Sequence, residues 1–188
     1  MNNDRKIFKY RKVSGYQITE FAAAFVILIF CVVIPLIDLG IVPIHWLLAQ
    51  EIISAEAELL SQSESFGSAI KALETDVSFK QRLMGFAKVK PISTQCSMII
   101  TALNDYDFYI ASTPKDIPAA WLPNGSKAPC KYELEICSEI ELSPLILASQ
   151  ISTPIPGLTK PFKCKVISRA NWENTGRDPL TKKYFLEE

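Results

Sequence analysis

A single carboxylate beside a long apolar segment is the residue whose position most calls for a chemical explanation. Glu20 lies five residues after Gly15, and residues 21–37 follow it as an unbroken apolar run. An acidic side chain costs about 2.5–3.5 kcal/mol at the centre of a membrane helix and less towards the ends. A carboxylate at this place can either pair with a cation from another chain or extend to the lipid headgroups without a partner.

The other candidates for chemistry do not form a catalytic group. The only histidine, His45, lies near the end of the apolar region, so the rest of the chain has no Ser-His-Asp or Cys-His combination. P-loop, H-E-x-x-H and G-x-G-x-x-G motifs do not occur. Acidic residues separated by multiples of two positions are typical of the solvated face of a β-strand, because alternate side chains point to the same face. Four glutamates have this spacing: Glu133, Glu135, Glu139 and Glu141. We expect no enzymatic activity, no cofactor and no metal ion.

Five cysteines divide between the apolar run and the rest of the chain. Cys31 lies inside the run, where a small thiol is expected to pack against lipid or another helix. The other four are Cys96, Cys130, Cys137 and Cys164. An even number in an oxidising compartment is compatible with two disulfides, and free buried thiols are the alternative. A zinc site is disfavoured because the spacings are wide and no C-x-x-C occurs.

The apolar segment is long enough to be a membrane-spanning helix. From Phe21 to Ala49 the only ionisable residues are Asp38 and His45. About 20 apolar residues, rising about 1.5 Å each, span the hydrocarbon core of a bilayer. The apolar core of a cleaved signal peptide is usually only about 7–15 residues long, and a buried core helix would not need a basic flank. We therefore expect a retained membrane helix over residues 16–49.

The distribution of charge gives that helix a direction. Residues 1–15 hold five basic residues and one acidic residue, a net charge of +4, and because the whole chain is neutral the remainder carries −4. Basic residues flanking a membrane helix remain in the cytoplasm. This predicts a cytoplasmic leader over 1–15 and an extracytoplasmic part beyond residue 49. The leader is explained by topology, so we expect no nucleic-acid partner.

Residues around the far end of the apolar run predict an irregular helix. Pro35 and Pro43 each remove a backbone donor, which membrane helices tolerate better than soluble ones. We expect Pro43 and Gly40 to mark a bend near the outer interface. Asp38 is either an interfacial residue that stabilises this bend or a residue used in subunit pairing.

The exported part is predicted to combine helices with a small antiparallel sheet, an α+β fold. Residues 50–90 are expected to be helical, with the first helix ending near residue 63, a second over 66–86 and a β-rich domain over 91–188. Alternation of apolar and polar residues predicts strands over 93–101, 107–111, 132–142 and 162–169. The acidic face of 132–142 and the cationic face of 162–169 predict that these two strands are antiparallel neighbours. The tail from Asn174 is polar and is expected to be loosely held.

The first fifty residues carry a resemblance to a known family. A basic leader, Gly15, the sequence Tyr16-Gln17-Ile18-Thr19-Glu20-Phe21 and a long apolar helix resemble the processing site of type IV prepilin-like proteins. Within that group, Glu20-Phe21-Ala22, the internal Pro35 and Asp38-Leu39-Gly40 are similar to the TadE-like pilus assembly proteins. The resemblance covers residues 15–60, and the β-rich part is only loosely similar.

The resemblance implies a structural function. A membrane-embedded prepilin peptidase would cut after Gly15 and leave Tyr16 as the N-terminus, with an α-amino group of ordinary pKa about 7.7–8.0. Glu20, followed by Phe21, would pair with the Tyr16 amine of an adjacent subunit and fix the axial register. The implied partners are other pilins or pseudopilins, the assembly machinery, the peptidase and lipid of the bacterial inner membrane. The alternative is a single-pass anchored binding protein that is not cleaved and has no filament role.

Overall fold

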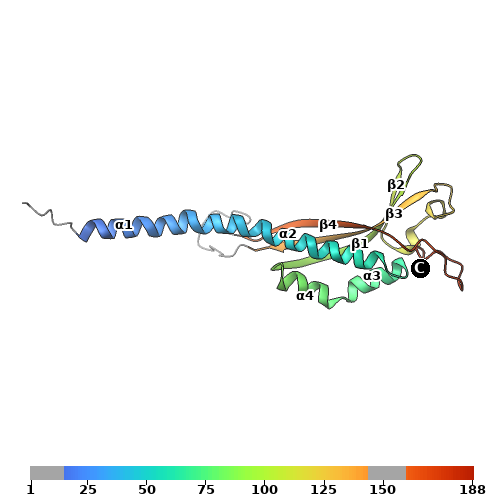
Figure 1. Cartoon of the computed structure of the whole chain (residues 1–188), viewed down its shortest axis with the longest axis horizontal. Coiled ribbons are helices and arrows are strands. Elements are labelled where there is room, and N and C mark those ends of the chain that lie inside the picture. The colour runs from blue at the N-terminus through green and yellow to red at the C-terminus, as the bar shows by residue number, and fades with distance from the viewer. Residues whose placement is uncertain (1–14, 144–159) are drawn as a thin grey trace, which may run out of the picture.

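The chain folds as a long helix that carries an α+β head at its C-terminal end (Figure 1). A computed structural model describes residues 15–143 and 160–188; the expected leader therefore lies almost entirely outside the described residues. The long helix is continuous and contains one short π-helical segment. Its parts are α1 (Gly15–Leu28), the π-helical η1 (Ile29–Val33) and α2 (Ile34–Ser61). The predicted helix over residues 16–63 is confirmed, with its C-terminal end within two residues of the predicted one.

Four antiparallel strands form one sheet in the order β2-β1-β3-β4. They are β1 (Val89–Ala102), β2 (Phe108–Ala111), β3 (Cys130–Leu142) and β4 (Phe162–Asn171). Two 3₁₀ turns, η2 (Pro114–Asp116) and η3 (Ala119–Trp121), lie in the proline-rich connection between β2 and β3. All four predicted strands and the antiparallel fold class are confirmed.

In strand β3, the alternation of apolar and polar residues in the sequence matches the alternation of buried and half-buried side chains. Its even-numbered side chains from Tyr132 to Leu142 are buried, and its odd-numbered side chains are only half-buried. β4 runs antiparallel beside it, with Glu139 opposite Lys165 and Glu141 opposite Lys163. Arg169 Nε lies 2.8 Å from Glu135 Oε2. The predicted match of an acidic face with a cationic face is confirmed, each opposite-charge pair contributing about 0.2–1 kcal/mol.

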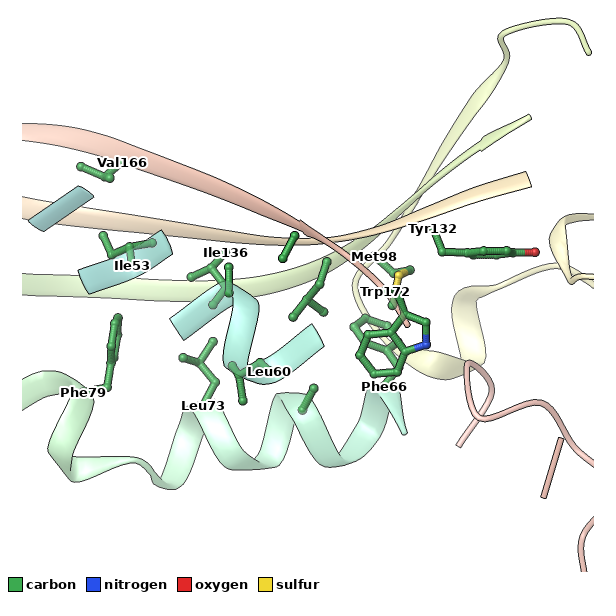
Figure 2. Close-up of a cluster of buried hydrophobic side chains, with 14 of the residues drawn as sticks. Ile53, Leu60, Phe66, Leu73, Phe79, Met98, Tyr132, Ile136, Val166 and Trp172 are labelled. Atoms are coloured by element: carbon green, nitrogen blue, oxygen red, sulfur yellow. The ribbon is translucent and has the colours of Figure 1, made fainter. Parts of the chain in front are cut away.

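The core lies between the sheet and a layer of helices, as Figure 2 shows. The helices α3 (Phe66–Thr75) and α4 (Val77–Gly85) cover β1, and the C-terminal half of α2 covers β3 and β4. Each helix buries apolar side chains at helical spacing: Ile53, Ala57 and Leu60 on α2, Phe66 and Leu73 on α3, and Phe79 and Leu83 on α4. Full burial of a leucine, isoleucine or phenylalanine contributes about 1.5–3 kcal/mol.

The prediction of a single helix over residues 66–86 is wrong. Asp76 has extended backbone angles, φ −72° and ψ 98°, so α3 ends there and α4 begins with Asp76 as its N-cap. The break changes which side chains face the sheet. In α4, Val77 and Met84 are exposed, and Phe79 and Leu83 are buried.

The prediction of a loosely held tail is also wrong. Tyr184 and Leu186 are buried in the core. The backbone N–H of Phe66 donates to the Phe185 carbonyl at 3.0 Å, and that of Gly67 donates to the Glu188 carbonyl at 2.6 Å. The first N–H groups of a helix have no partner within the helix. The tail accepts hydrogen bonds from two of these N–H groups of α3 and is thereby docked against the head.

Candidate assembly site: the exposed stem helix

The N-terminal half of the long helix projects from the head without contact to the sheet (Figure 1). We call residues 15–41 the stem, because Val42 is the first residue that packs against the core. Its large apolar side chains are exposed, and the most apolar window of the helix is 0% buried. Residues 18–41 rise about 36 Å, against about 30 Å for the hydrocarbon core of a bilayer. The stem is therefore long and apolar enough to cross a membrane.

The predicted processing position lies at the beginning of the stem. Gly15 is the first residue of α1, and Tyr16 follows in its first turn. The side chains of Tyr16 and Gln17 lie outside the described residues.

Glu20 and Phe21 occupy adjacent positions on the exposed stem. Glu20 is exposed, and no cation of the described residues lies within ion-pair distance of its carboxylate. Phe21 stacks on Phe25, one turn later, with ring centroids 6.3 Å apart. The stem therefore presents an acidic group beside an aromatic pair to whatever surrounds it.

Pro35 explains the π-helical segment. A proline cannot donate to the carbonyl four residues earlier, and its ring clashes with that carbonyl. The helix widens over η1 just before Pro35, and the Ile34 N–H donates to the Ile29 carbonyl, five residues earlier. A π-helical turn of this kind is a known way to absorb such a clash.

Gly40 and Pro43, which we expect to mark a bend, do not interrupt the helix. Both residues lie within α2, which continues as an α-helix through them, and the irregularity of the helix is at η1 instead. Gly40 has no neighbouring atom within 4 Å of the place a Cβ would occupy, so its role is not set by contacts within this chain. The side chain of Asp38 lies outside what the structure describes.

Within the head, one ion pair was not predicted from the sequence. Arg82 of α4 pairs with Glu56 of α2, whose side chain is only 2% exposed. Leu59, three residues after Glu56, is exposed. Glu56 lies three residues after Ile53 and four before Leu60. That spacing is the signal that could have identified Glu56 as buried.

The four cysteines of the head do not form the expected disulfides; all five cysteines of the chain are free thiols. The sheet register explains why. Cys96 lies opposite Ile136 and Cys164 opposite Ile140, so both share the helix-covered face but are separated by β3. Cys137 lies opposite Gln95, on the other face, and Cys130 lies opposite Ala102. Burial raises the pKa of the Cys96 thiol to about 12, so it is an unreactive packing group at neutral pH.

The glutamate row is part of the sheet surface. Glu133 pairs with Lys131 at 2.8 Å and Glu135 with Arg169, so two of the four carboxylates have cationic partners. Within residues 15–143 and 160–188 there is no group of three His, Cys, Asp or Glu side chains that could hold a metal ion. Comparisons of this chain with protein-family models, with curated proteins and with solved structures return no match.

Proposed function

We propose that this chain is a TadE-like minor pilin or pseudopilin, a structural subunit in the assembly of a Tad-type pilus or related secretion filament. The observation that carries the proposal is the stem, an apolar helix that the head leaves uncovered from Ile18 to Ile41. A soluble domain would not leave so large an apolar surface in water. Lipid before assembly and neighbouring helices after it are the surroundings that match its chemistry.

The position of Glu20 supports assembly rather than anchoring alone. An anchor needs only apolar length, whereas a carboxylate on the stem lowers the stability of membrane insertion. A positively charged amine from a neighbouring chain offsets that cost and fixes the axial position of one stem against the next. In the proposed subunit that amine belongs to Tyr16, freed by cleavage after Gly15 in the bacterial inner membrane.

The experiment determines the N-terminus of the protein by intact mass spectrometry, with and without a co-expressed prepilin peptidase. The expected product begins at Tyr16 only when the peptidase is present. The matched control is Gly15→Leu, which keeps the charge and the apolar segment but places a bulky residue before the cleaved bond. Its product should begin at Met1 in both cells. An intact Met1 in the wild-type protein with active peptidase would exclude the processed subunit and favour an anchored binding protein.

A further inference from the structure

Strand β1 is paired along its whole length on one side, but only at its end on the other. β3 pairs with residues 89–102, whereas β2 pairs only with Met98–Thr101. No segment within residues 15–143 and 160–188 pairs with the second side of Ser93–Ser97, which we call the open edge. An unpaired strand edge presents a row of N–H and C=O groups that can bond to another chain.

A groove of about 810 Å³ follows the open edge. Ile70 and Leu73 of α3 form its apolar wall on the helix side of the sheet. Thr94 and Cys96 face the same side, because their partners Ser138 and Ile136 are buried there. The opposite wall is mixed, with polar Ser93, Gln95 and Ser97 and apolar Ile110, and the charged Glu74 and Lys80 also line the groove. A strand laid in this groove would need an apolar side chain at every second position.

The open edge lacks the charges that normally protect such an edge. Ser93–Ser97 carries no charged residue, and the register shift between Pro91 and Ser93 lies just before it. The edge of β4 is different. Lys163 and Lys165 lie along it, and Gln50 Nε2 of α2 donates to the Ile167 carbonyl at 3.2 Å.

We propose that the open edge binds an extended segment of a different polypeptide, antiparallel to β1 and in line with β2. β2 is the template for this interaction: its Ala111 is buried on the helix side and its Ile110 is exposed on the other side. The segment spans about five residues, a usual strand length, and its apolar side chains contact Ile70 and Leu73. Main-chain hydrogen bonds supply the affinity, and the apolar wall of the groove selects segments with apolar side chains at alternate positions.

A second copy of this chain does not fit the open edge; this step rests on the proposed function. The strands run along the direction of the stem (Figure 1), so antiparallel pairing of two open edges would point the two stems in opposite directions. Two subunits in one membrane have parallel stems. Of the two edge strands of a second copy, β4 is bonded by Gln50 at the Ile167 carbonyl, and β2 is only 4 residues long. We therefore take the occupant to be a strand from another protein.

The test uses the full chain in detergent micelles and a labelled peptide of alternating valine and threonine with a lysine at each end. We expect saturable binding by fluorescence anisotropy, and no binding of the same peptide N-methylated through its central five residues. Thr94→Lys places a charge on the groove side and should weaken binding at least tenfold. Asn171→Lys, at an exposed position on β4 away from the groove, is the matched control and should change it less than twofold.

Hydrogen exchange on the wild-type protein keeps the test decisive if Thr94→Lys does not fold. The peptide should slow exchange in Ser93–Ser97 and leave β4 unchanged. Equal binding of the N-methylated peptide, or no binding of either peptide, would overturn the proposal. A dimer of the chain that Thr94→Lys dissociates would identify a second copy instead. Peptide binding by a chain that the peptidase does not process would retain this inference and reject the filament subunit.

Discussion

Arg82 of α4 donates to the carboxylate of Glu56 on α2, and this pair joins the long helix to the helix layer that covers β1. The Glu56 side chain is 2% exposed and that of Arg82 is 38% exposed. Without its partner, the Glu56 carboxylate would have almost no contact with water, whereas the Arg82 guanidinium would still be partly solvated. A buried carboxylate without a partner is costly, whereas a cation at the surface remains solvated.

Removal of Arg82 should therefore be more harmful than removal of both partners. Arg82→Ala leaves an uncompensated buried charge and should cost about 3 kcal/mol, the low end for buried pairs because Arg82 is partly exposed. The double variant Glu56→Leu, Arg82→Leu should cost less, since it leaves no buried charge. Urea unfolding of the full chain in micelles, followed by tryptophan fluorescence, measures both. Equal losses for the single and double variants would contradict the prediction.

The C-terminal segment should be released by a single methyl group. A Cβ at Gly67 would lie 2.6 Å from the Glu188 carbonyl oxygen, a distance that side chains do not adopt. Gly67→Ala should displace residues 184–188 and cost about 1–3 kcal/mol, as overpacking does. Hydrogen exchange should rise in the segment from Trp172 onwards. Gly85→Ala is the control, because no atom lies within 4 Å of the place its methyl group would occupy, and unchanged exchange in both variants would exclude this docking role.

Asp76 should stabilise α4 in a pH-dependent way. A hydrogen bond from the Ser78 side chain, supported by the Ser78 backbone N–H, whose nitrogen lies 2.7 Å from Asp76 Oδ1, lowers the pKa of this carboxyl below its ordinary value. A lowered folded-state pKa adds stability above the ordinary value near 4, and that stability is lost as pH falls through the folded pKa. Asp76→Ala should cost about 0.5–2 kcal/mol at pH 7, and less as the pH falls through the folded-state pKa of Asp76.

The control for Asp76 is Glu74→Ala, an exposed carboxylate two residues earlier. It should change the free energy of unfolding by less than about 0.5 kcal/mol at pH 7. Urea unfolding at pH 7 and at low pH measures both variants. If the two variants respond to pH alike, Asp76 does not act as an N-cap.

The strands could be predicted because their signal is local. In β3 each residue's burial follows from its place in a two-residue period, and the charges of β3 and β4 predicted which strand lies beside which. The long helix was predictable for the same reason, since apolar length is a property of one segment.

The features that sequence reasoning missed depend on residues far apart. The local sequence around Asp76 is compatible with an uninterrupted helix. The helix breaks there because α4 takes a new direction that buries Phe79. Glu56 is buried only because Arg82 comes to it from 26 residues away. The tail docks because α3 offers unpaired N–H groups at Phe66 and Gly67, which no pattern within the tail reveals.

The proposed role of Glu20 predicts that a substitution at this position impairs filament assembly without impairing membrane insertion. Glu20→Gln removes the charge but keeps the size and hydrogen-bonding capacity of the side chain, so insertion of the stem into the membrane should be retained or slightly improved. Incorporation into a filament should fall at least tenfold, because a neutral amide no longer pairs with an amine at the start of a neighbouring stem. The matched control is Glu51→Gln, an exposed glutamate of α2 beyond the stem, which should leave both quantities unchanged. Membrane fractionation and immunoblotting of sheared filaments measure the two steps, and normal incorporation of Glu20→Gln would exclude register pairing through this carboxylate.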